Sequence, residues 1–193
     1  MARQYDVILQ DISRNRAAFA ERVAEIRADQ RLTAEGKREM ITEAYSAAMQ
    51  AHNALKAELA QAREAALVAA RGRAFASRDA SPAGEANYRA AIAQAREASR
   101  DGRQMQALVD QAVATRDSTL LRALAFIGHE TGNGGLLRVV AQHEGTVADL
   151  LDVEARFGNA QSPDMRLANS MATTAPSRPP EVSQMAANAA MLH

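Results

Sequence analysis

The sequence contains no cysteine and no tryptophan, and only 4% of its 193 residues are aromatic. Without cysteine the chain cannot form a disulfide scaffold, an iron–sulfur cluster, a cysteine-ligated zinc site or a thiol nucleophile. Its 23 basic and 23 acidic side chains cancel, so it lacks the positive surplus with which proteins coat nucleic acid or anionic lipid. No residue pattern identifies a reaction. We therefore predict a protein that is not an enzyme and has no cofactor.

Long apolar runs are also missing. No stretch approaches the ~18 consecutive apolar residues needed to cross a bilayer. Residues 1–10 lack the apolar segment and the small-residue cleavage site of a secretory signal. We expect the protein to be made and used in a cytoplasm, or in a particle assembled there, with no membrane partner.

Alanine and arginine dominate what is present. About 45 residues are alanine and about 21 of the 23 basic residues are arginine, a strong departure from average usage. Alanine has the highest helix propensity of all residues. The composition therefore predicts an all-α protein whose core is built from alanine, leucine, valine, isoleucine and methionine.

Two long helices are predicted at the N-terminus. The first, from Tyr5 to Gln30, has apolar residues at spacings of three, four or seven, interrupted only by Arg16. Thr33 is the predicted N-cap of a second helix that extends from Ala34 to about Arg71. The two heptad stripes are Tyr5, Leu9, Ile12, Phe19, Val23 and Ile26, and then Ile41, Tyr45, Ala48, His52, Leu55, Leu59, Ala62, Ala66 and Ala69.

The short connection between these helices forces an antiparallel, coiled-coil-like hairpin. A slip of one heptad, which would place Phe19 against His52, is the main alternative to a register symmetric about Leu32. The far end of the second helix is nearly all alanine, so another helix could approach it closely. The symmetric register pairs Val23 with Ile41, Phe19 with Tyr45, Arg16 with Ala48, Ile12 with His52 and Leu9 with Leu55.

Two polar residues on the predicted seam have alternative interpretations. In one interpretation His52 forms a pH-sensitive layer of the seam, because its charge changes near neutral pH. In the other, which we favour, His52 is a polar residue that sets the register of the two helices and keeps one edge in water. Arg16 has the same alternatives, and its aliphatic stem would cover Ala48 while the guanidinium reaches solvent. Both are candidate interaction residues, together with Leu55, Leu59, Ala62 and Ala66.

A change in composition divides the chain. We expect a long helical hairpin at 1–72, a linker at 73–84, a compact bundle of short helices at 85–158 and an extended tail at 159–193. Ser81-Pro82 supplies an N-cap and a first-turn proline for the first bundle helix. The other helices are predicted at 104–115, 118–128 after Asp117, 136–143, and 147–157 after Thr146.

The tail contains four of the five prolines, and the segment 177–180 cannot be helical. A short helix at 181–191 would be marginal alone. We expect the tail to be disordered in isolation and ordered only where a neighbouring subunit or partner holds it. Pro179, Pro180 and Met185 are its candidate interaction residues.

Three patterns offer chemistry, and each has a plainer interpretation that we favour. His129-Glu130 and His143-Glu144 could bind a divalent cation, but adjacent helical residues point about 100° apart and are better explained as polar helix ends. The glycine-rich segment 131–135 could cradle an anion, but no strand precedes it and it lacks the lysine of a nucleotide loop, so a tight turn is favoured.

The third pattern is a small basic cluster of Arg71, Arg73 and Arg78 around Phe75, a combination that suits a phosphate backbone. Overall neutrality weighs against nucleic acid, and this cluster is the one place where we keep such a contact open. An arginine-rich chain with two lysines also arises from a GC-rich genome.

The segment 32–37, Leu-Thr-Ala-Glu-Gly-Lys, opens a long alanine-rich helix in a neutral, arginine-rich chain with a proline-containing tail. Over about residues 1–75 this combination resembles small all-helical structural proteins of tailed phages that infect GC-rich bacteria. The resemblance implies a virion component, capsid-associated or head–tail connecting, that docks through helices and a C-terminal arm in multiple symmetric copies. The alternatives are a bacterial helical adaptor that binds a partner peptide or helix, and a capsid scaffolding protein.

Overall fold

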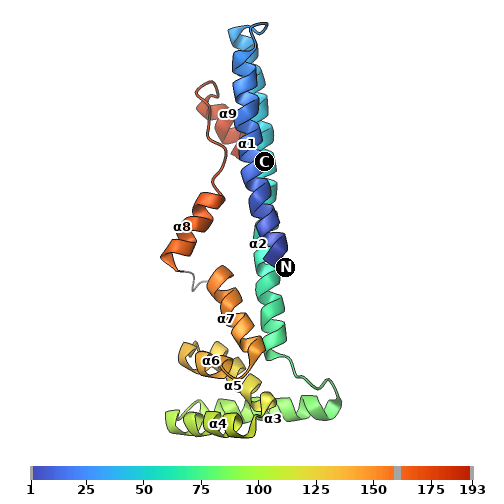
Figure 1. Ribbon diagram of the computed structural model, residues 1–193, viewed down its shortest axis with the longest axis vertical. Helices are drawn as coiled ribbons and strands as arrows, with labels where there is room; N and C mark the ends of the chain where they lie inside the picture. Colours follow the sequence, from blue (N-terminus) through green and yellow to red (C-terminus); the bar gives the residue numbers. More distant parts are fainter. Residues whose placement is uncertain (1, 159–161, 192–193) are drawn as a thin grey trace. The chain divides into compact units, whose positions relative to one another are not determined.

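A computed structural model describes residues 2–158 and 162–191, and every regular element in these ranges is an α-helix (Figure 1). The prediction of an all-α protein is confirmed. The chain packs as two compact units. Unit 1 combines Met1–Glu64 with Ser162–His193, and unit 2 is Ala65–Gln161. This grouping differs from the four consecutive parts expected from the composition, because the C-terminal segment packs on the N-terminal helices.

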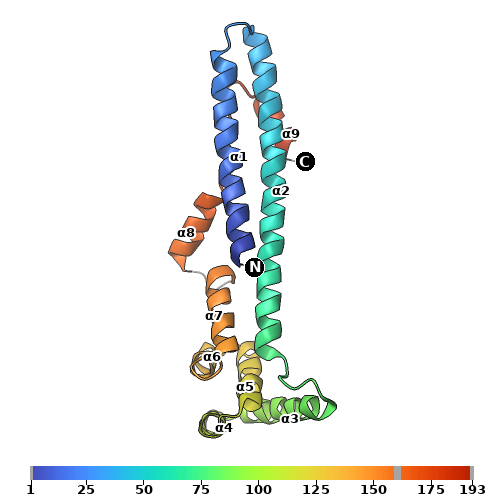
Figure 2. The ribbon, with the colours of Figure 1, turned by 45° about the vertical axis from the view of Figure 1, so that its right-hand side comes forward.

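Unit 1 is built on α1 (Ala2–Ala28) and the first part of α2 (Ala34–Phe75), which run side by side in opposite directions (Figure 2). The Thr33 hydroxyl accepts a hydrogen bond from the Gly36 N–H at 3.1 Å, as expected of an N-cap. The rings of Phe19 and Tyr45 lie with centroids 5.8 Å apart. A register symmetric about Leu32 requires this contact, whereas a slip of one heptad would place Phe19 against His52.

The C-terminal segment of unit 1 is more helical than expected. It contains α8 (Pro163–Ala172) and α9 (Gln184–Met191), whereas residues 159–161 and 192–193 of the predicted tail lie outside the described residues. The Ser162 hydroxyl accepts from the Met165 N–H and Pro163 occupies the first turn, so α8 has a strong start signal. Apolar residues of α1, α2 and this segment share one core, made of Phe19, Val23, Ile26, Ile41, Tyr45, Ala48, Met49, Val182, Ala187 and Ala190.

Unit 2 contains the end of α2 and five shorter helices. They are α3 (Pro82–Ala98), α4 (Gly102–Thr115), α5 (Ser118–Glu130), α6 (Gly134–Ala141) and α7 (Gly145–Phe157). Helix α5 is the centre of the unit, because α3, α4 and α6 all pack against it and eight of its residues are buried. Side chains cap α3 to α6 at their first turns, namely Ser81, Asp101, Asp117 and Asn133.

The connection from α2 to α3 is shorter than the predicted linker, since α2 continues to Phe75. The Tyr88 hydroxyl donates to the Phe75 carbonyl at 2.6 Å and so binds one of the open carbonyls at the end of α2. A Cβ at position 84 would collide with Asp79, which explains the glycine there. Within the described ranges, no helix combines the length and the hydropathy required to span a membrane.

Candidate functional site

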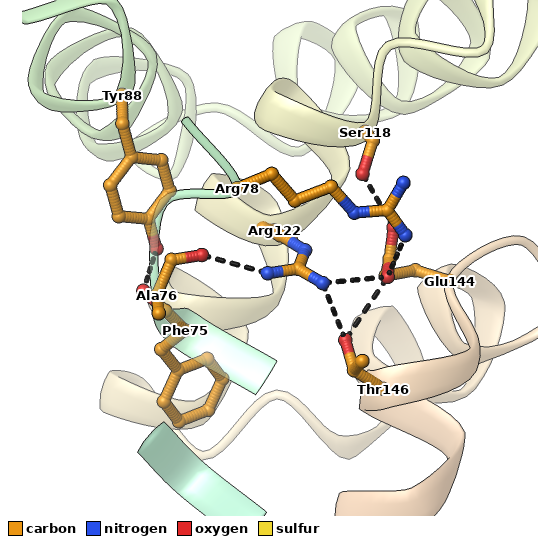
Figure 3. Close-up of polar contacts among 8 residues, drawn as sticks. All are labelled: Phe75, Ala76, Arg78, Tyr88, Ser118, Arg122, Glu144 and Thr146. Atoms are coloured by element: carbon orange, nitrogen blue, oxygen red, sulfur yellow. Dashed lines mark hydrogen bonds and ion pairs between the residues drawn. The ribbon is translucent and has the colours of Figure 1, made fainter. Parts of the chain in front are cut away.

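A buried polar cluster in unit 2 joins the chain after α2 to helices α5 and α7 (Figure 3). The Arg122 guanidinium donates to the Glu144 carboxylate at 3.2 Å, and the two side chains are only 7% and 2% exposed. Arg122 also donates to the carbonyl of Ala76 at 2.8 Å. The cluster therefore fixes the segment that leaves α2 to the interior of the bundle.

The Glu144 carboxylate is saturated with donors. Ser118 donates to it at 2.7 Å, Thr146 at 3.0 Å and Arg78 at 3.1 Å, in addition to Arg122. Burial by itself would raise the pKa of Glu144, but the hydrogen bonds from Ser118, Thr146 and Arg122 outweigh it and hold the pKa below its ordinary value. A carboxylate so fully engaged is poorly suited to abstract a proton or bind a metal, and the arrangement is that of a structural staple.

The two histidine–glutamate pairs of the sequence are separated by the fold. His129 Nε2 lies 3.0 Å from Glu154 Oε1, which Arg71 also approaches at 3.3 Å. Glu130 pairs with Arg96 at the surface, and His143 is exposed while its neighbour Glu144 points into the buried cluster. Among the residues that the structure describes, no three histidine, aspartate or glutamate side chains gather as a metal site would require.

The basic cluster after α2 is partly neutralised. Arg71 pairs with Glu154 at 3.3 Å and Arg78 with Glu144 at 3.1 Å, whereas Arg73 is exposed. Two of its three guanidinium groups therefore contact carboxylates of the protein itself. This placement weakens the case for a phosphate backbone at this position.

The glycine-rich segment forms a turn between α5 and α6. Gly132 has a positive φ of 69°, and the Asn133 side chain accepts from the Leu136 N–H at 3.0 Å. Beside it lies a cavity of about 460 Å³ with both hydroxyl and apolar groups on its walls. Its lining includes Ser99, Gln106, Thr131 and Asn133 on the polar side and Met105, Val109, Leu136 and Val139 on the apolar side.

The expectation that His52 keeps an edge in water is wrong. Its side chain is only 2% exposed, and within the described part of the chain Nδ1 has no hydrogen-bond partner. Burial, with the nearby positive charge of Lys56, lowers the pKa of His52 from its ordinary value of 6.5. On the same helix Leu59 and Ala66 are buried, whereas Leu55 and Ala62 are half-buried.

Arg16 also differs from its predicted position. The hydrogen bond to Ala48 comes from Asn15, whose Nδ2 donates to the Ala48 carbonyl at 2.9 Å. Arg16 lies one residue further around α1, where it lines a cavity with Pro179 of the C-terminal segment. The heptad stripe of α1 shifts at this point, since Ile8 is buried and Leu9 only half-buried.

The C-terminal segment is held to the hairpin by a specific ion pair. Arg27 Nε and Nη2 donate to the two oxygens of Glu181, each at 2.8 Å. Next to this fork Val182 is fully buried, and Arg178 Nη1 donates to its carbonyl at 2.9 Å. Of the predicted tail contacts, Pro179 is buried against the hairpin, whereas Pro180 and Met185 are exposed.

Helix α8 presents an apolar face that sequence inspection missed. None of its residues is buried, and Leu167 and Met171 are 61% and 65% exposed. Residues four apart lie on one face of a helix, so these two side chains form a continuous apolar strip, and Arg166 lies about 100° or more from it around the helix. The start of this helix could have been predicted from the sequence, because Ser162-Pro163 repeats the Ser81-Pro82 start motif.

Comparison with known protein families, with curated proteins and with solved structures finds no match to this chain. A function for it therefore has to be argued from its own residues.

Proposed function

We propose that the protein is a non-enzymatic structural protein that docks its helices onto other chains of an assembly in which it is present in symmetric copies. The exposed strip of Leu167 and Met171 carries this proposal. A helix of ten residues is marginal in water, and exposed leucine and methionine side chains favour burial. A partner that covers this strip would stabilise α8.

The occupant that fits this strip is a second copy of the same chain. The protein has a formal net charge of zero, so two copies do not repel each other, and chains of low net charge associate readily. Association about a twofold axis would place the α8 strip of one copy against that of the other. This arrangement would bury apolar surface on both copies.

The resemblance of residues 1–75 to structural proteins of tailed phages directs the proposal to a virion component, capsid-associated or head–tail connecting. In such an assembly the C-terminal segment would act as an arm. Its contacts with α1, made by Glu181 and Val182, are contacts that an exchanged segment could make equally with a neighbour. The location would then be the virion. A transient scaffolding protein is a related alternative, but it would not need an ordered C-terminal segment.

A helical adaptor is the second candidate function. The cavity of about 460 Å³ beside the α5–α6 turn supports it, because apolar and hydrogen-bonding groups line the same hollow. An adaptor would bind a peptide or helix of another protein in this cavity and would remain a monomer on its own.

Light scattering across a concentration series tests the assembly proposal. We expect the full chain to self-associate, and Leu167→Glu with Met171→Glu to return it to a monomer, because charged side chains in the buried strip would repel each other. Arg166→Glu places a negative charge on a different face of α8, about 100° or more around the helix from both strip residues, and should leave the association unchanged. A chain that is monomeric at every concentration contradicts docking through a second copy and favours the adaptor.

A further inference from the structure

A second surface of unit 1 combines positive charge with an apolar floor. A cavity of about 260 Å³ lies between α1 and the segment that precedes α9. Its floor includes Phe19, Val23 and Pro179, and its rim carries three arginines, Arg16, Arg27 and Arg178. The volume lies just below the usual range of small-molecule pockets, about 300–1,000 Å³, and suits a single side chain or a compact acid.

The rim arginines of α1 lie on one face of the helix. Arg16 and Arg27 are eleven residues apart, which corresponds to three turns and brings both guanidinium groups to the same side, roughly 16 Å apart along the axis. Phe19 and Val23 fill the intervening positions of that face. A ligand lying along α1 would therefore meet apolar side chains between two cationic ends.

The three arginines of this rim differ in whether their guanidinium groups have partners within the protein. Arg27 is engaged by both oxygens of Glu181, and the Arg178 guanidinium donates to the Val182 carbonyl. Arg16 is half-buried and has no hydrogen-bond or ion-pair partner among the residues that the structure describes. The chain as a whole is neutral, so this uncompensated charge is a local property of the cavity.

We infer that this cavity binds an acidic peptide segment of a partner chain, with an aspartate or glutamate carboxylate on Arg16 and a neighbouring apolar side chain on Phe19 and Val23. The geometry repeats a contact that the protein already makes with itself. Glu181 reaches Arg27 in a two-oxygen fork, and the following residue, Val182, is buried beside it. An acidic residue next to an apolar one is therefore the sequence pattern that this face of α1 recognises.

This inference rests on the proposed role as an interaction protein and names the chemistry of one partner. It concerns a different surface from the α8 strip. The Leu167→Glu, Met171→Glu chain should therefore bind the acidic peptide as well as the unchanged chain does, and failure of self-association would leave the inference standing.

The test is fluorescence anisotropy of a labelled peptide of alternating leucine and glutamate with the full-length protein. We expect saturable binding that weakens as salt increases, and no binding of the matched peptide in which glutamine replaces each glutamate. The variant Arg16→Gln should weaken binding by about tenfold or more, because it removes the uncompensated charge. The affinity of Arg16→Lys for the peptide should lie between those of Arg16→Gln and the unchanged chain, since lysine keeps the charge but lacks the planar fork.

Arg14→Gln is the matched control, because Arg14 lies on the same helix, is exposed and pairs with Asp11 away from the cavity. It should bind the peptide like the unchanged chain, and circular dichroism should show equal helix content in all variants. Equal losses for Arg14→Gln and Arg16→Gln would overturn the inference in favour of nonspecific charge attraction. Tighter binding of a single-stranded oligonucleotide, lost in Arg16→Gln, would overturn it in favour of a phosphate ligand.

Discussion

Arg122 and Glu144 form an ion pair at 3.2 Å in which both side chains are nearly inaccessible to water. They are 22 residues apart in the chain and belong to the centre of α5 and the residue that precedes α7. A buried pair contributes little net stability compared with apolar residues, but removing one partner leaves an uncompensated charge in the interior. The other partners of the Arg122 guanidinium are neutral, namely the Ala76 carbonyl at 2.8 Å and the Thr146 hydroxyl at 3.2 Å, and its Nε has no hydrogen-bond partner among the described residues.

Glu144→Gln should therefore destabilise unit 2 by about 3 kcal/mol, because the Arg122 charge loses its counterion. Urea denaturation followed by circular dichroism measures the change. The matched control is Glu130→Gln, which removes an exposed partner of Arg96 and should cost less than about 1 kcal/mol. Equal effects of the two substitutions would contradict a structural role for the buried pair.

The lowered pKa of His52 predicts a pH dependence of unit 1. Above the ordinary histidine value of 6.5 the imidazole is neutral in both the folded and the unfolded chain, and stability does not depend on it. Below that value the unfolded chain takes up a proton that the buried imidazole does not, so the free energy of unfolding falls as the pH falls toward the lowered pKa.

Urea midpoints at about pH 7.5 and about pH 5.5 test this dependence. The unchanged chain should lose stability between them, and His52→Gln should lose less because its side chain does not titrate. His143→Gln changes an exposed histidine and should keep the full dependence. The same loss of stability in the His52 variant and in the unchanged chain would show that burial of the imidazole has no part in the effect.

Val182 should anchor the C-terminal segment, since its side chain is fully buried against the hairpin. Val182→Ala removes two methyl groups and should weaken the attachment by about 2 kcal/mol. Endoproteinase Glu-C, which cleaves after glutamate, should then cleave after Glu181 several times faster, as judged by mass spectrometry of the released fragment. Val7→Ala, at a position 43% exposed on α1, should leave the cleavage rate unchanged. Rapid cleavage of the unchanged chain would instead mean that the segment is held only by a neighbouring copy.

Local signals in the sequence predicted most of the helices. The start motif Ser81-Pro82 and the caps Thr33 and Asp117 act through hydrogen bonds to N–H groups two or three residues ahead, so they are visible in a short window. Ser162-Pro163 carries the same signal, but the surrounding polar and proline-rich composition concealed it. Asp101 is the N-cap of α4, which therefore begins at Gly102, two residues before the predicted start at 104.

The candidate sites were less predictable because they depend on distant residues. Nothing near Glu144 in the sequence indicates that Arg78, Ser118 and Arg122 converge on it. Heptad periodicity predicted the contact between Phe19 and Tyr45 but placed Arg16 where Asn15 packs. An ideal helix drifts by about 20° per heptad from a 3.5-residue repeat, so the pattern leaves two adjacent positions close to the seam, and only packing decides between them.

The bond between Arg27 and Glu181 joins residues 154 positions apart, and it affects the order in which the chain matures during synthesis. Residues 65–161 leave the ribosome as one continuous stretch and can complete their packing while translation continues. The hairpin is translated before this stretch but cannot complete its packing, because Val182, Ala187 and Ala190 of its core are translated after it. Residues 65–161 can therefore finish folding before the hairpin does, and the apolar face of the hairpin stays open to chaperones or to a neighbouring nascent chain until the C-terminal segment has been made.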